Sequence, residues 1–144
     1  MKFALKKAGS ETDYAVPPLE GLWWMDNPAE FSEGNKDQWK WTLMIAQPDF
    51  ITKELFKSAQ DEVLKKKKLD TSNVKLTKFK EGKAIQLLHI GSYSNETENI
   101  SRMHSFINDN GYTFNGKHHE IYLSDPRKTA AEKLKTILRQ PVKK

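Results

Sequence analysis

Residues 39–46, WKWTLMIA, alternate between apolar side chains and polar or smaller ones, which is the pattern of a β-strand. Trp39, Trp41, Leu43 and Ile45 would share one face of it. The segment is short and flanked by polar residues, so it predicts a strand rather than a helix.

An earlier segment, 13–25, also favours an extended backbone, but Pro17 and Pro18 interrupt it. Proline cannot donate a ladder hydrogen bond, so this stretch is either an edge strand or a strand with a break at the prolines. We expect its second part, 19–25, to pair antiparallel with 39–46.

Helical spacing of apolar residues begins after Thr52, which can cap a helix over 52–68. The helix would end in a run of four lysines at 65–68. Cations in the last turn favour the helix dipole, so this run indicates a solvated helix end. The apolar stripe of this helix is expected to contain Leu55, Phe56, Ala59 and Val63.

A second helix is predicted at about 95–110, capped by Ser94 or Asn95. Glu96 and Glu98 would lie in its positive first turn, where acidic side chains are favourable. Its buried face is expected to contain Ile100, Met103, Phe106 and Ile107.

The remaining apolar segments predict strands. Residues 73–93 indicate a hairpin with its turn at Glu81-Gly82, and strands are expected at 118–124 and 136–142, with a short helical turn before the last. Antiparallel strands that alternate with lone helices indicate an α+β fold, with the helices on one face of an antiparallel sheet.

An acidic residue, Glu120, stands in the middle of the apolar strand at 118–122. Strand geometry places His118, Glu120 and Tyr122 on one face and His119 and Ile121 on the other. The apolar pair Ile121 and Leu123 would face the helices, which leaves Glu120 and Tyr122 on the opposite face.

Two environments for Glu120 stay open at this point. In open water it would be an ordinary exposed or salt-bridged acid. In a hollow walled by aromatic rings it would attract a cationic ligand, or serve as a general acid or base beside the Tyr122 hydroxyl.

Four tryptophans gather on the first two predicted strands: Trp23, Trp24, Trp39 and Trp41. Core packing is the ordinary use of such residues. Because Trp23 and Trp24 are adjacent in a strand, they point to opposite faces. At least one tryptophan should therefore leave the helix-packed core and line the other sheet face.

Composition excludes several kinds of protein. The 144 residues suffice for one domain with a core, and no apolar run approaches the ~20 residues of a membrane helix. Cysteine is absent, which excludes thiol chemistry, and the start of the chain does not have the pattern of a signal peptide. We therefore expect a cytoplasmic location.

Charge and motifs give few further candidates. The formal charge of +5 raises nucleic acid as a partner, but the aromatics are not interleaved with the lysines, so we expect no direct binding of nucleic acid. The neighbouring side chains of His118 and His119 diverge, so we expect no metal site. Without a glycine-rich phosphate loop or a serine nucleophile motif, we expect no cofactor.

Four stretches together carry a family resemblance: PLEGLWW (18–24), WKWTLMIAQPDFIT (39–52), LLHIGSY (87–93) and HHEIYLSDPRKTAAEKLKTILRQPV (118–142). The chain resembles the stand-alone bacterial members of the GyrI-like small-molecule-binding family. The resemblance implies a single domain over 1–144, built from two strand–helix–strand–strand modules at about 1–70 and 71–144. It also implies a ligand groove on the sheet face away from the helices.

The same resemblance implies a function. Related domains bind bulky aromatic, often cationic compounds, including many drugs, and anchor them with a glutamate that Glu120 matches here. The resemblance also implies an alternative, because some stand-alone members hydrolyse cyclopropane-bearing DNA-alkylating antibiotics with a glutamate and a tyrosine, which Glu120 and Tyr122 would supply. The expected ligand-binding residues are Glu120, Tyr122, His118, Trp23, Trp39 and Trp41.

One departure from the family pattern has consequences for partners. The first module begins at its second strand, so its first strand and first helix are not in this sequence. Either the chain is short, or a partner chain supplies the missing part. The exposed sheet edge that this leaves favours association, including a homo-oligomer. A regulatory module that acts on a protein partner is a third expectation for the function.

Overall fold

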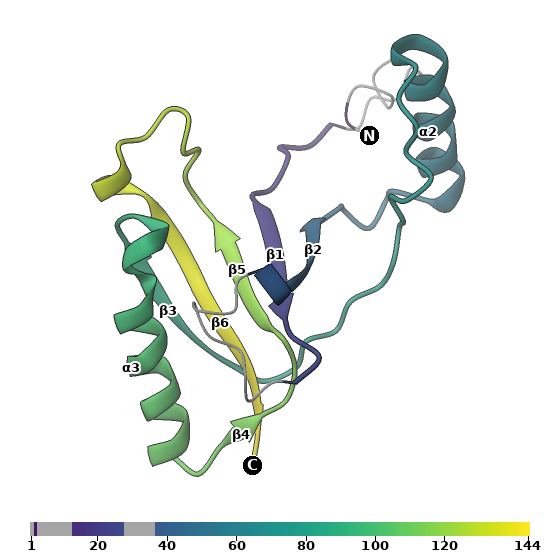
Figure 1. Ribbon diagram of the computed structural model, residues 1–144. Coiled ribbons are helices and arrows are strands. Elements are labelled where there is room, and N and C mark those ends of the chain that lie inside the picture. The colour runs from purple at the N-terminus through teal and green to yellow at the C-terminus, as the bar shows by residue number, and fades with distance from the viewer. Residues whose placement is uncertain (1, 3–12, 28–36) are drawn as a thin grey trace. The chain divides into compact units, whose positions relative to one another are not determined.

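The structure is a computed structural model that describes residues 2, 13–27 and 37–144. The chain divides into two compact units (Figure 1). The described residues of the first unit are 13–17 and 46–79, with 2, and those of the second are 18–27, 37–45 and 80–144.

The second unit contains an antiparallel sheet with strand order β2-β1-β5-β6-β3, and β4 pairs with β6 beside this path. The described residues also form helix α2 in the first unit and helix α3 in the second. This arrangement confirms the predicted α+β class. The strands are β1 Leu19–Trp24, β2 Lys40–Ile45, β3 Ala84–Ile90, β4 Thr113–Phe114, β5 His118–Tyr122 and β6 Lys135–Lys143, and the helices are α2 Lys53–Lys67 and α3 Glu96–Asp109.

The first two strands pair as predicted. β1 and β2 are antiparallel, with Trp23 opposite Trp41 and Leu19 opposite Ile45. Pro17 and Pro18 precede β1, so neither proline interrupts the ladder. The other edge of β1 pairs with β5, which places β5 between β1 and β6.

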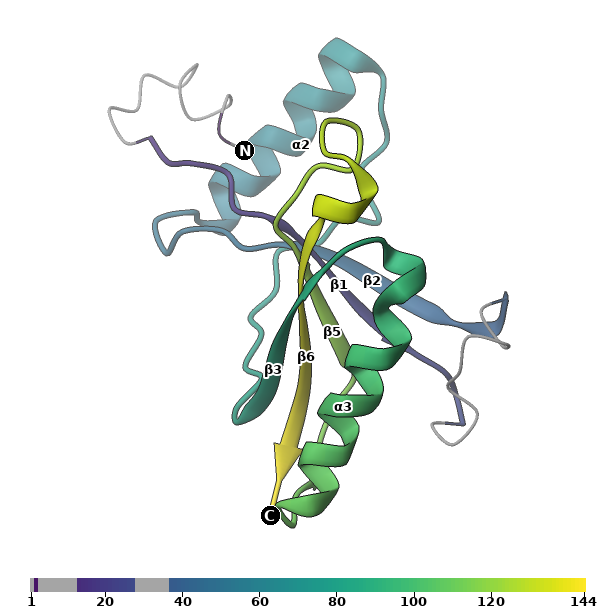
Figure 2. The ribbon, with the colours of Figure 1, turned by 90° about the vertical axis from the view of Figure 1, so that its left-hand side faces the viewer.

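Helix α3 packs on the β6 and β3 end of the sheet (Figure 2). Met103 and Ile107 of α3 form the core of this unit with Leu138 and Val142 of β6, and all four side chains are buried. Burial of a large aliphatic side chain contributes roughly 1.5–3 kcal/mol, so this contact fixes the helix on the sheet. Ile85, Ile100 and Tyr112 pack around it.

The end signals of α2 agree with the predicted helix. The Thr52 hydroxyl oxygen accepts a hydrogen bond from the backbone N–H of Leu55 at 3.2 Å. Lys68 ends the helix in the left-handed conformation, with φ 57°. The basic side chains at 65–67 lie in the last turn, where they complement the dipole, and they are exposed.

Three local predictions are wrong. Residues 73–80 do not form a strand, because β3 pairs with β6 instead, and the Gln60 side-chain amide donates to the carbonyl of Val74. Phe106, which was expected on the buried face of α3, is 51% exposed, because Met103 and Ile107 are the neighbouring side chains that pack against the sheet. The two-residue strand β4 was not predicted, since two residues carry too little pattern.

Candidate functional site

Glu120 lies at the centre of β5, between Gly21 of β1 and Leu138 of β6. Paired residues of antiparallel strands point to the same face, and Leu138 packs against α3. Glu120 therefore faces α3, and only 8% of it is exposed. The prediction that Ile121 and Leu123 face the helix is wrong; Leu123 is exposed. Glu120 therefore does not lie on the sheet face away from the helices, where the ligand groove was expected.

The inward face of β5 is polar because α3 and the turn before it present polar and aromatic groups to it. The Tyr93 and Tyr122 rings meet edge to face, with centroids 5.9 Å apart. Glu96, in the first turn of α3, lies near enough to Glu120 to contribute to lowering the pKa of that carboxyl. Glu96 is only 7% exposed, so it is not the solvent-exposed acid that a role at the helix dipole alone would require.

Glu120 is held as a carboxylate by its neighbours. The His118 Nε2 lies 2.7 Å from one carboxylate oxygen, and the Tyr122 hydroxyl donates to the other at 3.2 Å. Burial alone raises the pKa of Glu120, but the hydrogen bond and charge of His118, with Glu96 and the hydrogen bond of Tyr122, outweigh it. The pKa therefore lies below its ordinary value.

Tyr122 links the carboxylate to the tryptophans. Its hydroxyl oxygen accepts a hydrogen bond from the Trp23 indole N–H at 3.0 Å. Burial and the charge of Glu120 raise the pKa of Tyr122 well above its usual range. At neutral pH the hydroxyl therefore keeps its proton and can donate it in a hydrogen bond.

A glycine makes this contact sterically feasible. Gly21 pairs with Glu120 across the ladder, between the positions of Leu19 and Trp23 on the same face. A Cβ atom at position 21 would lie 2.7 Å from the Trp23 Nε1 and 3.2 Å from the Tyr122 hydroxyl oxygen. The missing side chain thus leaves the space in which indole and phenol meet.

Three tryptophans form a ring cluster beside Tyr122. The ring centroid of Trp23 is 6.1 Å from that of Trp39 and 6.3 Å from that of Trp41. Trp41 is 60% exposed, so the outer part of the cluster is open to solvent. Trp24 faces away from the cluster, with the Lys117 ammonium 3.5 Å from its ring centroid.

All six residues singled out from the sequence thus come together: Glu120, Tyr122, His118, Trp23, Trp39 and Trp41. Sequence reasoning missed Gly21, Tyr93 and Glu96. For Tyr93 and Glu96 the only signal was their place at the start of α3, directly after β3. A helix cap and the helix dipole already account for polar residues at the start of a helix, so nothing in the sequence pattern indicated that Tyr93 or Glu96 belongs to a site.

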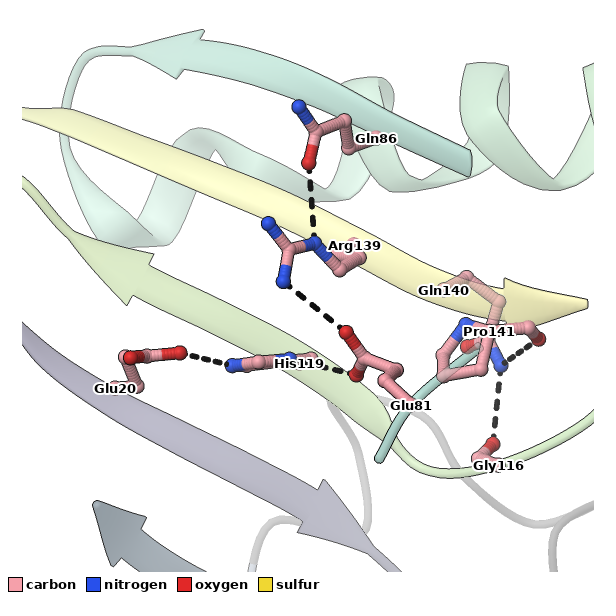
Figure 3. Close-up of polar contacts among 8 residues, drawn as sticks. All are labelled: Glu20, Glu81, Gln86, Gly116, His119, Arg139, Gln140 and Pro141. Atoms are coloured by element: carbon pink, nitrogen blue, oxygen red, sulfur yellow. Dashed lines mark hydrogen bonds and ion pairs between the residues drawn. The ribbon is translucent and has the colours of Figure 1, made fainter. Parts of the chain in front are cut away.

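A second polar cluster lies on the opposite face of β5 (Figure 3). The His119 ring, 1% exposed, has Nδ1 2.7 Å from a Glu81 oxygen and Nε2 2.7 Å from a Glu20 oxygen. Arg139 of β6 donates to the other Glu81 oxygen at 3.1 Å and to the side-chain oxygen of Gln86 at 3.0 Å. These contacts tie the segment that enters β3 to the centre of the sheet.

Two further findings concern the described residues only. No group of three or more His, Cys, Asp or Glu side chains in this part of the chain is placed to hold a metal ion. Among these residues, no helix combines the length and apolar character needed to cross a membrane.

Comparison with known proteins identifies the family. A crystal structure of an uncharacterized conserved protein from Listeria innocua is 43% identical, with a TM-score of 0.89, and the match covers 99% of this chain and 72% of that one. Two crystal structures of a hydrolase from Listeria innocua are each 41% identical, with TM-scores of 0.81 and 0.84, and the matches cover 99% of this chain and 73% of theirs.

No curated protein sequence matches the chain. The model of the GyrI-like small molecule binding domain matches residues 2–143, which is nearly the full length. The chain therefore belongs to the family of GyrI-like small molecule binding domains.

Proposed function

We propose that this domain binds bulky aromatic, often cationic small molecules, with Glu120 as the charged anchor. The observation that carries the proposal is a nearly buried carboxylate that hydrogen-bonds to Tyr122, which in turn contacts a cluster of aromatic rings. Glu120 is 8% exposed and accepts a hydrogen bond from Tyr122, and Trp23 lies on the neighbouring strand two residue pairs along the ladder. A desolvated negative charge attracts a cation strongly, and aromatic faces add cation–π attraction.

The environment of Glu120 favours an electrostatic role over a basic one. Its pKa lies below the ordinary value because the contacts of His118, Glu96 and Tyr122 outweigh burial. A carboxylate of lowered pKa is a weak proton acceptor but keeps its charge over a wide pH range. This property suits the recognition of a cation better than proton abstraction.

The other residues have distinct proposed roles. His118 holds the Glu120 carboxylate in place from within β5. Tyr122 orients the same carboxylate and offers an aromatic surface, and Trp23, Trp39 and Trp41 extend that surface. In this proposal the chain works in the cytoplasm, needs no cofactor and does not bind nucleic acid directly.

Titration with tetraphenylphosphonium, a lipophilic aromatic cation, tests the anchor. Glu120→Gln keeps the shape of the side chain and removes its charge, so affinity should fall roughly 30-fold or more, because losing a desolvated charge pair costs about 2–5 kcal/mol. Glu98→Gln is the matched control, because Glu98 is an exposed acid in the first turn of α3. Equal affinities of the Glu120→Gln variant and the wild type would refute the anchor.

A second candidate function is hydrolysis. Two similar structures are named hydrolases, and the Tyr122 hydroxyl lies within hydrogen-bond distance of Glu120. On a cyclopropane-bearing alkylating antibiotic, Glu120 would take a proton from water while the hydroxide oxygen bonds to a ring carbon. The ring C–C bond would break, its electron pair would move into the conjugated carbonyl system, and Tyr122 would protonate that system.

Mass spectrometry distinguishes the two functions. After incubation with a cyclopropane alkylator, hydrolysis gives a product heavier than the substrate by one water, and turnover continues beyond one equivalent of protein. Tyr122→Phe should then lower the rate more than it lowers the affinity for substrate. Stoichiometric binding with no hydrated product would leave the binding function alone.

A further inference from the structure

The Thr136 side chain is fully buried, and its hydroxyl has no hydrogen-bond partner in the part of the chain that the structure describes. Thr136 lies in β6, opposite Tyr122 of β5 and His89 of β3. It is two positions from Leu138 on the same strand, so it faces α3 as Glu120 does. Burying a hydroxyl without a partner costs free energy, so its place in the folded protein calls for an explanation.

The two residues that pair with Thr136 have their polar groups engaged elsewhere. The Tyr122 hydroxyl donates its hydrogen to Glu120 at 3.2 Å. The two ring nitrogens of His89 lie 2.8 Å from a side-chain amide nitrogen of α3 and 2.9 Å from a carbonyl oxygen of the turn before it. The amide nitrogen can only donate and the carbonyl oxygen can only accept, so both ring nitrogens are occupied. Neither neighbour therefore satisfies the Thr136 hydroxyl.

Tyr93 reaches across β6 close to this hydroxyl. It follows β3 in the chain, whereas its ring meets the ring of Tyr122 in β5 edge to face, with centroids 5.9 Å apart. β6 lies between β3 and β5, and neighbouring strands are about 4.8 Å apart, so the Tyr93 side chain extends over β6 to make this contact. Tyr93 is 38% exposed, so its outer side contacts solvent.

We propose that Thr136 is a specificity-determining residue whose hydroxyl hydrogen-bonds to a polar group of the bound small molecule. This inference rests on the proposed binding function. An aromatic ring of the ligand takes the place of the Tyr93 ring against Tyr122, and an oxygen substituent on that ring pairs with the Thr136 hydroxyl. The preferred ligands are therefore aromatic cations that carry a hydroxyl or carbonyl group, rather than cations built of hydrocarbon rings alone.

Calorimetric titration with two monocations of nearly equal size tests this contact. (4-Hydroxymethylphenyl)triphenylphosphonium carries a hydroxyl where (4-ethylphenyl)triphenylphosphonium has a methyl group. The wild type should bind the first roughly three- to tenfold more tightly, because it gains one net hydrogen bond. Thr136→Val keeps the side-chain shape without the hydroxyl, so this preference should disappear while affinity for the ethyl compound stays within about twofold. Thr42→Val, the same change at an exposed position of β2, is the matched control and should keep the preference.

Unfolding without ligand keeps this inference separate from the proposed function. Thr136→Val replaces an unpaired buried hydroxyl by a methyl group, so its midpoint of urea unfolding should rise above that of the wild type. An equal or lower midpoint would reveal a structural partner for the hydroxyl, such as a bound water, and would overturn the inference.

The titrations separate the two remaining outcomes. Equal affinity of the wild type for both cations overturns the role of Thr136 and leaves the binding function intact. A wild type that binds neither cation refutes the proposed function and the ligand contact with it.

Discussion

Gly21 shows how one backbone position governs the contacts of two large side chains. Its missing Cβ leaves the space in which the Trp23 indole reaches the Tyr122 hydroxyl at 3.0 Å. Tyr122 in turn donates to Glu120. The orientation of the candidate anchor therefore depends on a residue that has no side chain of its own.

Gly21→Ala should break this chain of contacts. The new Cβ would lie 2.7 Å from the Trp23 Nε1, so the indole must move or the strand must shift. Overpacking of this kind costs roughly 1–3 kcal/mol. Urea unfolding measures the cost. The comparison is the same Gly21→Ala substitution made in the Trp23→Phe variant, in which the clashing indole nitrogen is absent. Full stability of Gly21→Ala would show that the indole does not need that space.

His104 predicts a dependence of stability on pH. Burial, with the charge of His118, lowers the pKa of His104 below its ordinary 6.5. As pH falls through 6.5, the unfolded chain takes up this proton before the folded chain does, so the folded state loses stability. Urea unfolding at pH 7 and pH 5 should show a smaller loss in His104→Gln than in the wild type. Equal losses would contradict this assignment.

At the same scale, the sequence identified chemistry better than orientation. Glu120 was found because an acid inside an apolar strand is unusual. The face predicted for Glu120 is wrong, because the apolar character of Ile121 and Leu123 predicts that those two residues point inward. The inward positions are polar here, since the buried Glu96 lies near Glu120 and Tyr93 packs on Tyr122. Contacts of this kind join polar residues of two separate elements, so neither segment shows a periodic pattern that would predict them.

At the scale of elements, the rotation of α3 about its axis is the main determinant of the site. Ile107 is fully buried against β6, whereas its neighbour Phe106 is 51% exposed. The same rotation brings Glu96 over β5. The helix and its length followed from sequence periodicity, but its rotation depends on which apolar residues meet the sheet.

A pair of alanine variants tests this rotation. Ile107→Ala removes a buried side chain and should cost about 2–5 kcal/mol of unfolding free energy. Phe106→Ala removes a larger side chain that is half exposed, and it should cost clearly less. Chemical denaturation of the two variants gives the comparison. A greater loss for Phe106→Ala would mean that α3 packs with its other side toward the sheet.

Strand prediction succeeded where alternation was long and failed where hydrogen-bond partners decided. β1, β2, β5 and β6 were expected close to their observed positions. Residues 73–80 have strand-like composition but no ladder partner, and the Gln60 amide donates to the carbonyls of Thr71 and Val74. Partner choice is a property of the fold and cannot be derived from one segment.

At the scale of the whole molecule, apolar side chains remain exposed on β1 and β2. Leu43 and Ile45 are 54% and 44% exposed, and Trp41 and Leu19 lie on the same face. Among the strands of the described residues, β2 is also the last at its end of the sheet order. Apolar surface next to an open strand edge favours association with another chain.

We therefore expect the chain to self-associate as its concentration rises. Leu43→Lys places a charge on the apolar face and should shift the population toward monomer in sedimentation velocity. Thr42→Lys adds the same charge on the opposite face of β2 and serves as the control. A wild-type chain that stays monomeric up to high concentration would contradict the expectation.

The two-sided character of β5 has a consequence for how this sequence can vary. Its inward residues make the Glu96 and Tyr122 contacts, and its outward His119 joins Glu20 and Glu81. Loss or gain of a single codon in the loop at 115–117 that displaced β5 by one position would exchange the two faces. Both polar clusters would be dismantled together, so we expect length changes to be tolerated far less in this loop than composition changes.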